Sequence, residues 1–378
     1  MARAPAIADI EELPQADRLE GFPHPRETKE LYGHAGAERM LAEALSSERI
    51  HHAWLLTGPQ GIGKATLAYR FARAALAAPE ERDASGQSLA VADTTSAARQ
   101  VRALSHPGLM VIRRPYDVKA KRFATSIPVD EVRRLRSFLA HRAAGDGWRI
   151  VIVDEAGELN VNAANALLKS LEEPPTRTIF LLVASAPGRL VPTIRSRTRA
   201  LALAPLGESD LRAAVTQALA AAEMKTPAPA AEWAALEPLA EGSAGRLLGL
   251  LASGGGELQA RVTKLLSLLP KVDWRAVHAL ADELQPIAAQ PRFELFFELL
   301  LASLSRLIRA AASGEGTPAD RELAARVIGD TRLASFAALW ERIAREKADT
   351  VALNLDRKSL ILEIVARLAA AAQDRKPA

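Results

Sequence analysis

The sequence contains no cysteine, so disulfide bonds and thiolate-bound zinc are excluded. Its seven histidines are scattered along the chain and show no metal-ligand spacing. No apolar run is long enough to cross a bilayer, and residues 2–30 lack the apolar core of a signal peptide. We therefore expect a soluble cytoplasmic protein without a zinc site.

An excess of charge is also absent. The 49 Lys and Arg residues nearly balance the 45 Asp and Glu residues, which leaves a net charge of +4 and a pI of about 9.4. That balance permits weak attraction to nucleic acid but does not establish it. The chain has 378 residues, 49% of them hydrophobic, so it can bury a sizeable core in two or three domains.

One stretch, residues 148–198, organises the rest of the chain. It opens with the apolar run 150–153, which ends on Asp154 and Glu155. This pattern predicts a buried parallel strand with carboxylates at its C-terminal end, where open α/β sheets bind ligands. An Asp there can hold Mg²⁺, and a following Glu can polarise an attacking water. The alternative is a core βαβ unit with ordinary surface charges.

A helix and a second strand follow these acids. Apolar residues at positions 161, 164, 168 and 171 predict one buried helix face, and Pro174 and Pro175 end the helix. The apolar run 179–184 predicts another buried strand, and Ser196-Arg197-Thr198 comes after it.

A second motif lies earlier, where the short strand 53–57 runs into Gly58-Pro59-Gln60-Gly61-Ile62-Gly63-Lys64 and an amphipathic helix. Strand, glycine-rich turn and helix are the context of a phosphate-binding P-loop, in which backbone N–H groups converge on phosphate oxygens. Lys64 would meet the β and γ phosphates. The alternative is an ordinary βα turn, which the lysine directly after Gly63 disfavours.

The P-loop pattern has one defect. Ala65 stands where a hydroxyl should reach Mg²⁺, and Thr66 lies a helical step of about 100° away. We therefore expect weakened nucleotide binding and still weaker Mg²⁺-dependent hydrolysis. A dinucleotide-binding fingerprint fits less well, because Gly61-Ile62-Gly63 lacks the third glycine at the required spacing.

A basic segment, residues 113–122, carries five cations against Asp117: Arg113, Arg114, Lys119, Lys121 and Arg122. It is interpreted as a solvated loop in preference to a DNA-contact loop, because no ladder of aromatic residues accompanies the charges.

The remaining segments complete the outline. Residues 1–28 are expected to form an extended arm, 79–106 a loop or short helices, 109–112 and 200–203 strands, and 129–141 a helix. Pro205 and Gly207 mark a domain edge. Helices are expected over 209–222 and 230–239 and from 242, a flexible linker over 253–256, and helices from 257 to the end. Four apolar stripes in that last part indicate core or subunit packing.

Three stretches carry a family resemblance: HAWLLTGP over 52–59, NALLKSLEEPP over 165–175 and IRSRT over 194–198. With them the chain resembles the AAA+ subunits of the bacterial sliding-clamp loader, and within these the delta-prime family of DNA polymerase III. The resemblance implies an α/β AAA+ P-loop domain with a parallel sheet over 1–205. It further implies a small helical lid over 206–253 and an all-α collar or oligomerisation domain over 257–378.

The resemblance also implies roles for particular residues. Arg197, in a Ser-Arg-Cys motif with Thr198 in place of cysteine, would be a trans arginine finger in the neighbouring subunit's ATP site. Asp154 and Glu155 would be the Walker B acids, and Ser185 the first sensor. ATP or ADP, with Mg²⁺ if bound, would be held weakly by Gly58, Gly61, Gly63, Lys64, Thr66 and Ser185. The four-cysteine zinc module of relatives is replaced by residues 79–106.

The implied partners are the gamma/tau and delta subunits in a hetero-pentameric ring, the sliding clamp and, through the complex, primed DNA. The chain would belong to a DNA polymerase (nucleotidyltransferase) holoenzyme without being the polymerase. Ala65, and Gly245 where motor subunits carry a second sensor arginine, favour a subunit with weak or no ATPase. Two alternatives are an ATP-hydrolysing gamma/tau-like motor subunit and an unrelated nucleotide-binding enzyme such as a kinase.

Overall fold

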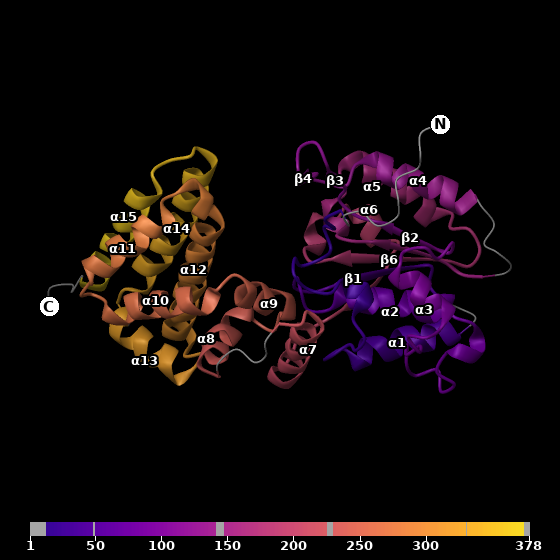
Figure 1. Cartoon of the computed structure of the whole chain (residues 1–378), viewed down its shortest axis with the longest axis horizontal. Coiled ribbons are helices and arrows are strands. Elements are labelled where there is room, and N and C mark those ends of the chain that lie inside the picture. The colour runs from indigo at the N-terminus through magenta and orange to yellow at the C-terminus, as the bar shows by residue number, and fades with distance from the viewer. Residues whose placement is uncertain (1–12, 48–49, 141–146, 225–229, 330, 374–378) are drawn as a thin grey trace. The chain divides into compact units, whose positions relative to one another are not determined.

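The computed structural model describes residues 13–47, 50–140, 147–224, 230–329 and 331–373. These residues fold into two compact units (Figure 1). The first comprises the described residues of Met1–Thr226 together with Gly242–Leu248. The second comprises those of Pro227–Glu241 and Gly249–Ala378, and it therefore takes in the 230–240 helix that the sequence assigns to the lid.

The first unit is built on a parallel sheet with the strand order β2-β5-β6-β1-β7. All four neighbouring pairs run parallel, with Trp54 opposite Leu181 and Ile150 opposite Ile179. The strands are β1 (Ala53–Thr57), β2 (Leu109–Ile112), β5 (Arg149–Val153), β6 (Thr178–Ala184) and β7 (Arg199–Ala202). The strands predicted at 53–57, 109–112, 150–153 and 179–184 are confirmed, and the one predicted at 200–203 lies one residue earlier.

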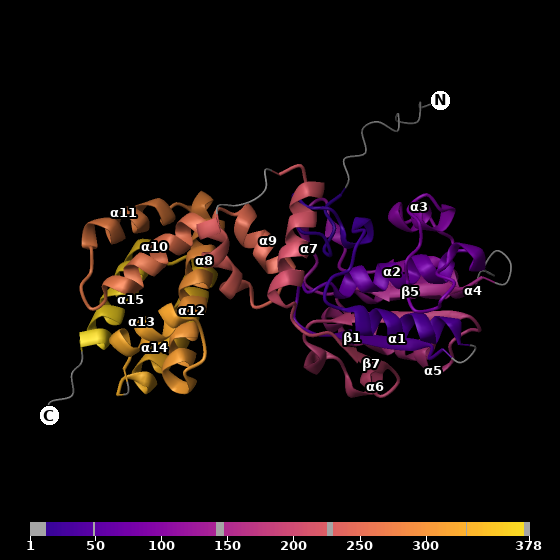
Figure 2. The same cartoon turned by 90° about the horizontal axis from the view of Figure 1, so that it is seen from below.

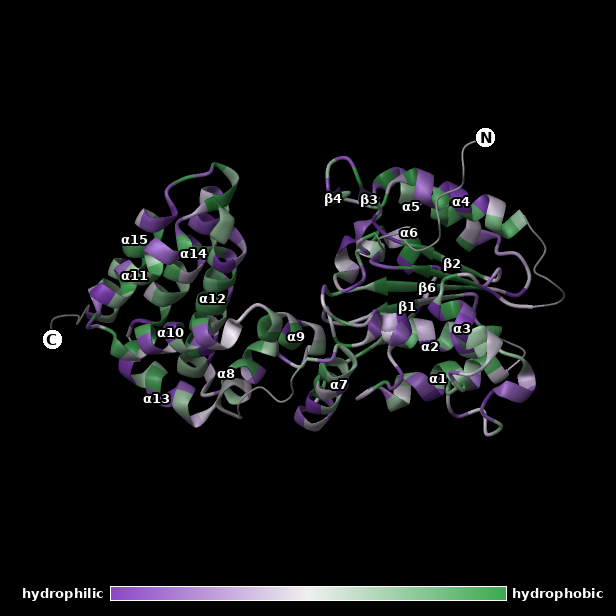
Figure 3. Ribbon diagram, viewed as in Figure 1, coloured by the Kyte–Doolittle hydropathy of each residue, from purple (hydrophilic) through white to green (hydrophobic). Residues whose placement is uncertain are grey.

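Helices cover both faces of the sheet, as Figures 1 and 2 show. Alternate strand residues serve two cores: Trp54 and Ile152 pack on one face, and Leu55 and Val153 on the other. The hydrophobic colouring of Figure 3 is accordingly strongest along the strands. The helices on the first face include α1 (Ala35–Ser46) and α2 (Lys64–Leu76), and those on the second include α4 (Val129–Ala140), α5 (Val161–Glu172) and α6 (Pro192–Arg195).

The predicted buried face of α5 is confirmed at Ala164 and Leu171 but not at Val161. Val161 is 70% exposed, whereas Ala163, Ala164 and Leu167 are buried. Asn160 caps the helix by accepting the N–H of Ala163, so position 161 falls in the first turn, outside the contact with the sheet. The small alanines then form the part of the helix that meets the second core.

The N-terminal segment is not simply extended. Residues 13–28 include the 3₁₀ turn η2 (Pro25–Glu27) and bury Phe22, His24 and Arg26. The predicted arm residues 1–12 lie outside the described residues. Residues 79–106 hold η3 (Pro79–Glu81) and α3 (Ser96–Arg102), in line with the expected short helices.

The basic segment is not a plain loop but a β-hairpin of β3 (Tyr116–Asp117) and β4 (Arg122–Phe123), paired antiparallel. Two further 3₁₀ turns, η4 (Ala156–Glu158) and η5 (Pro187–Arg189), lie after β5 and β6, and α7 (Glu208–Ala221) follows the sheet.

The second unit is helical, as predicted. Its longest helix, α12 (Gln290–Ser313), packs against α10, α13 and α14. The other elements are α8 (Ala230–Ala240), α10 (Gly255–Leu268), α11 (Trp274–Leu284), η6 (Ile287–Ala289), α13 (Pro318–Val327), α14 (Leu333–Ala352) and α15 (Arg357–Gln373), while α9 (Ala244–Ala252) spans the boundary between the units. In the described part of the chain, no helix combines the length and apolarity that crossing a membrane requires.

Two expectations about this unit are corrected. Residues 253–256 are not a flexible linker, because Gly254 adopts a left-handed conformation (φ +69°) and caps α10, which begins at Gly255. The apolar stripes of α14 and α15 are internal: Phe336, Ile343 and Ile361 are buried, and the Trp340 indole donates a hydrogen bond to the Leu301 carbonyl at 2.9 Å. They give no reason to expect a subunit interface.

Candidate functional site

The carboxyl edge of the sheet brings the predicted site residues together. Thr57 is opposite Ala184, and Val153 is opposite Leu182, so β1, β5 and β6 end side by side. Gly58, Asp154 and Ser185 directly follow the ends of β1, β5 and β6. Asp154 and Ser185, which lie 96 and 127 positions after Gly58 in the sequence, therefore meet it at one edge, as expected of an open α/β sheet.

The glycine-rich turn depends on backbone conformations that favour glycine. Gly58 has φ +137°, and a Cβ there would lie 2.3 Å from the Leu203 carbonyl oxygen. Gly61 has φ +76°, and a Cβ there would lie 2.5 Å from the Ser243 Oγ. The third glycine, Gly63, is the left-handed N-cap of α2. Since all three glycines adopt positive φ and neighbouring atoms crowd a side chain at Gly58 and Gly61, the loop is shaped to present main-chain groups.

The Lys64 ammonium is fully engaged within the loop. It donates to the carbonyl oxygens of Gly58 at 2.8 Å and Pro59 at 2.6 Å, and to the Ser185 hydroxyl at 2.9 Å. Burial lowers the pKa of Lys64, while the charges of Glu155 and Asp154 act in the opposite direction. Any phosphate that recruits this lysine must replace these three contacts.

The two acids after β5 differ in their surroundings. Glu155 accepts the backbone N–H of Ser185 at 2.6 Å, which links the ends of β5 and β6. Burial, with the nearby carboxylates of Asp17 and Glu155, raises the pKa of Asp154 from its ordinary value of 3.8 to about 8. Lys64 only partly offsets this effect. Asp154 is therefore largely neutral at pH 7, which makes it a poor ligand for a hard cation.

The residues present fit a phosphate group better than they fit Mg²⁺. The loop offers backbone N–H groups and Lys64, but Ala65 lacks the metal-binding hydroxyl, and the raised pKa of Asp154 disfavours its ionised form. Thr66 is buried in α2. Among the described residues, no group of three or more His, Asp or Glu side chains is arranged to hold a metal ion. The donor set for Mg²⁺ is thus incomplete.

The segment before α9 lies directly on the glycine loop. The Ser243 hydroxyl donates to the Gln60 carbonyl at 2.7 Å, and the Gly245 N–H donates to the Gly61 carbonyl at 2.9 Å. A Cβ at Gly245 would lie 3.0 Å from the Gly61 Cα, so a side chain there would crowd the loop backbone. Sequence reasoning noted Gly245 only as a missing sensor arginine and did not anticipate this backbone contact.

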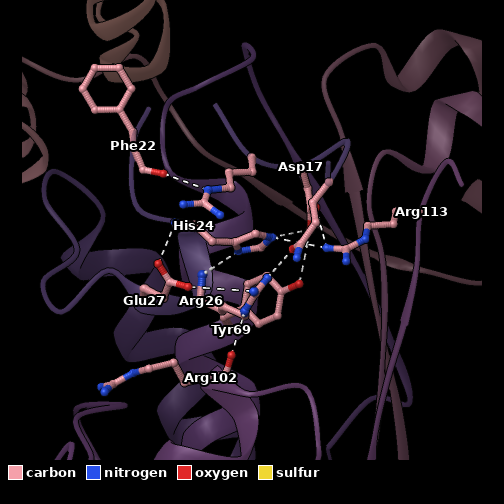
Figure 4. Close-up of polar contacts among 10 residues, drawn as sticks. Asp17, Phe22, His24, Arg26, Glu27, Tyr69, Arg102 and Arg113 are labelled. Carbon is pink, nitrogen blue, oxygen red and sulfur yellow. Dashed lines mark hydrogen bonds and ion pairs between the residues drawn. The ribbon is translucent and has the colours of Figure 1, made fainter. Parts of the chain in front are cut away.

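A buried polar cluster next to these acids was missed from the sequence. Figure 4 shows Asp17 of the N-terminal segment between the His24 ring and the Arg113 guanidinium. The Asp17 carboxylate contacts the His24 Nε2 at 3.0 Å, the Arg113 guanidinium at 2.6 Å and the Tyr69 hydroxyl at 3.3 Å. The Asp17 side chain is only 2% exposed. The only available signal was an isolated acid and a histidine in a proline-rich segment, which is too weak to find the cluster.

The protonation pattern of this cluster follows from its hydrogen bonds. The His24 Nδ1 accepts the Arg26 N–H at 3.1 Å, so the ring is neutral and Nε2 carries the proton that faces Asp17. Burial lowers the pKa of His24 accordingly. Burial acts to raise the pKa of Asp17, but the hydrogen bond to His24 and the charge of Arg113 outweigh it and hold that pKa below its ordinary value.

Arg197 lies in the turn between α6 and β7. Its guanidinium forms an ion pair with Glu172 at 2.9 Å and donates to the Thr193 carbonyl at 3.0 Å, and its side chain is 37% exposed. The two neighbouring arginines are placed differently. Arg195 is exposed, and the Arg199 guanidinium stacks over the Trp54 ring at 4.8 Å. Arg197 is therefore distinct from them, and its anchor Glu172 belongs to the Glu-Glu-Pro-Pro motif.

The parallel sheet, the glycine loop after β1 and the acids after β5 define a P-loop domain of the AAA+ class. A family model described as "DNA polymerase III, delta subunit" matches residues 33–207. DNA polymerase III subunit delta' of Escherichia coli is 32% identical over 270 residues, which cover 70% of this chain and 73% of that protein. The chain belongs to the delta-prime family of DNA polymerase III subunits.

Other relatives match shorter stretches. Subunit delta' of Pseudomonas aeruginosa is 41% identical over 147 residues, covering 39% of this chain and 41% of that protein. Subunit gamma/tau of Mycobacterium bovis is 33% identical over 174 residues, covering 46% of this chain and 28% of that protein. The chain thus spans less than half the length of these two relatives. A crystal structure of a DNA polymerase III gamma subunit-related protein from Thermotoga maritima aligns with 88% of this chain and 99% of its own, at 18% identity and a TM-score of 0.39.

Proposed function

We propose that this chain is a clamp-loader subunit that helps to place the sliding clamp on primed DNA during replication. The similarity to delta' of Escherichia coli over most of both chains carries this proposal. The proposed partners are gamma/tau and delta subunits in a hetero-pentameric ring, together with the clamp. The proposed place of action is the cytoplasm.

We assign the chain a supporting rather than a driving role in the ring. ATP or ADP binds weakly at Gly58, Gly61, Gly63, Lys64, Thr66 and Ser185, and hydrolysis at this site is negligible. Three features support this assignment: Lys64 is held by loop carbonyls, Ala65 lacks a hydroxyl, and burial raises the pKa of Asp154 to about 8. Each of them lowers the capacity to hold a metal-bound triphosphate.

Arg197 is proposed to act as a trans arginine finger on the ATP of a neighbouring subunit. Its partial exposure supports this role, as does the exposure of Glu172, its ion-pair partner. A guanidinium near the γ-phosphate stabilises charge that develops in the transition state. Glu172 holds this group in the free chain, so Arg197 must leave that ion pair to reach the γ-phosphate.

The helical residues 257–378 are proposed to form the collar through which the ring assembles, and 206–253 the lid. The internal apolar stripes no longer support the collar assignment. The collar assignment is supported instead by exposed apolar side chains on this unit: Trp274 is 42% exposed, and Ile287 and Leu353 are more exposed still. Because α8 packs against α10 and α12, it is expected to move with the collar.

A gamma/tau-like motor subunit is the second candidate, since a gamma/tau relative is 33% identical over 174 residues. Reconstitution with gamma/tau, delta and clamp tests both. The supporting role predicts a complex with the mass of five subunits, one of which is this chain. It also predicts that the clamp-stimulated ATPase of the complex survives the substitution Lys64→Ala in this chain. ATPase lost on Lys64→Ala supports the motor. Failure to join any such complex overturns the proposed function.

A further inference from the structure

The basic segment divides into two parts with different roles. Arg113 is paired with Asp17, and Arg114 forms an ion pair with Glu158 at 2.6 Å. Both pairs lie at the base of the β3–β4 hairpin. The three remaining cations, Lys119, Lys121 and Arg122, lie at the exposed tip. In the part of the chain that the structure describes, their side chains form no hydrogen bond or ion pair.

The base of the hairpin is held from two sides. Asp17 fixes Arg113 from the N-terminal segment, as Figure 4 shows, and Glu158 fixes Arg114 from η4. The Tyr116 and Phe123 rings meet edge to face with centroids 5.2 Å apart, and the Arg114 guanidinium lies 5.9 Å from the Phe123 centroid. A pair of two-residue strands could not hold its shape alone, so these contacts keep the tip in place.

The tip itself is a compact cationic turn. The Asp117 carboxylate accepts the N–H groups of Lys119 at 2.8 Å and Ala120 at 3.0 Å, so this acid closes the turn. The turn therefore carries three cations within four residues and only one carboxylate, that of Asp117. Val118, 59% exposed, is the large apolar side chain of the turn. The turn therefore offers charge and little apolar surface.

We propose that the β3–β4 hairpin tip binds the phosphate backbone of DNA through Lys119, Lys121 and Arg122. Regularly spaced phosphates suit such a turn, because closely spaced cations can each neutralise one phosphate and release its counterion. Because the tip residues 117–122 include no aromatic side chain, we expect contact without base stacking. The proposal deepens the proposed function, since it assumes that the chain works on primed DNA.

The experiment measures the affinity of the full purified chain for a labelled primer–template duplex and for single-stranded DNA over a salt series. We expect K119A/K121A/R122A to reduce the slope of log K against log salt by about 2–3 for duplex and by about 2 for single strands. The matched control K29A/R39A/K169A also removes two lysines and one arginine, all exposed on the first unit, and should keep the wild-type slope. Charge-preserving K119R/K121R/R122K should keep it as well.

Two results would overturn the proposal. One is an unchanged slope in the hairpin variant, with thermal unfolding like that of the wild type. The other is a hairpin variant that keeps the wild-type slope but no longer joins the complex, as judged by its mass. That result would indicate an acidic protein surface as the partner. If instead the wild-type chain fails to assemble while the slope still falls, the hairpin proposal stands and the proposed function fails.

Discussion

The ion pair between Arg197 and Glu172 allows the finger hypothesis to be tested in two directions. Arg197→Ala removes the guanidinium, whereas Glu172→Gln keeps it and removes only the charge that holds it. If Arg197 acts on a neighbour's ATP, Glu172 competes with the γ-phosphate for the same cation. The first change should therefore lower hydrolysis at that seam, and the second should raise it.

The structure limits the size of the second effect. The two side chains are 37% and 48% exposed, so the pair contributes about 0–1 kcal/mol in water. Releasing Arg197 can then raise the hydrolysis rate by at most about fivefold, because 1.4 kcal/mol corresponds to a factor of ten. The loss on Arg197→Ala should be much larger, since trans arginine fingers are worth about 10³–10⁵ in rate.

The assay is single-turnover hydrolysis in the reconstituted complex, with assembly measured by mass in parallel. Arg195→Ala and Arg199→Ala are the controls: one side chain is exposed, and the other is stacked on Trp54. Both should change the rate far less than Arg197→Ala. Hydrolysis that is unaffected by Arg197→Ala, or a Glu172→Gln loss as large as the Arg197→Ala loss, would refute the reasoning.

Three further predictions concern the first unit. The purified chain alone should hydrolyse ATP far more slowly than about 1 s⁻¹, a typical enzyme rate, because Ala65 lacks the metal-binding hydroxyl; fast turnover that vanishes on Lys64→Ala would contradict this. Asp154 binds its proton more tightly when folded, with a pKa of about 8 against 3.8, so its contribution to stability is full below pH 4 and is lost as the pH rises through 8. Asp154→Asn should therefore reduce the fall in unfolding free energy between pH 5 and pH 9 by roughly a few kcal/mol. Urea titrations in which the wild type and the variant show the same pH dependence would exclude this. Asp17→Asn should cost about 3 kcal/mol of unfolding free energy, because it leaves the largely buried Arg113 without its counter-charge; a denaturant midpoint like that of the exposed-site variant Glu80→Gln would show that the cluster adds little.

The sequence by itself determined the local elements and the class of site. Apolar β-branched runs such as 150–153 specify buried strands, and glycines before Lys64 specify a phosphate-binding turn, because both signals depend on neighbouring residues alone. Parallel strands must end at a common edge, so the meeting of Lys64 and Glu155 followed from the pattern, whereas Ser185 was placed there only by the family resemblance. The missing metal-binding hydroxyl at Ala65 could also be recognised from the sequence alone.

Only the tertiary structure decided which of these groups are available for function. Arg113 and Lys119 look equivalent in the sequence, but a carboxylate 96 residues away from Arg113 pairs with it, whereas Lys119 stays exposed. Likewise, the raised pKa of Asp154 depends on burial and on Asp17, which lies far away in the chain. Burial and long-range ion pairs arise from packing between distant segments, and for that reason no local pattern predicts them.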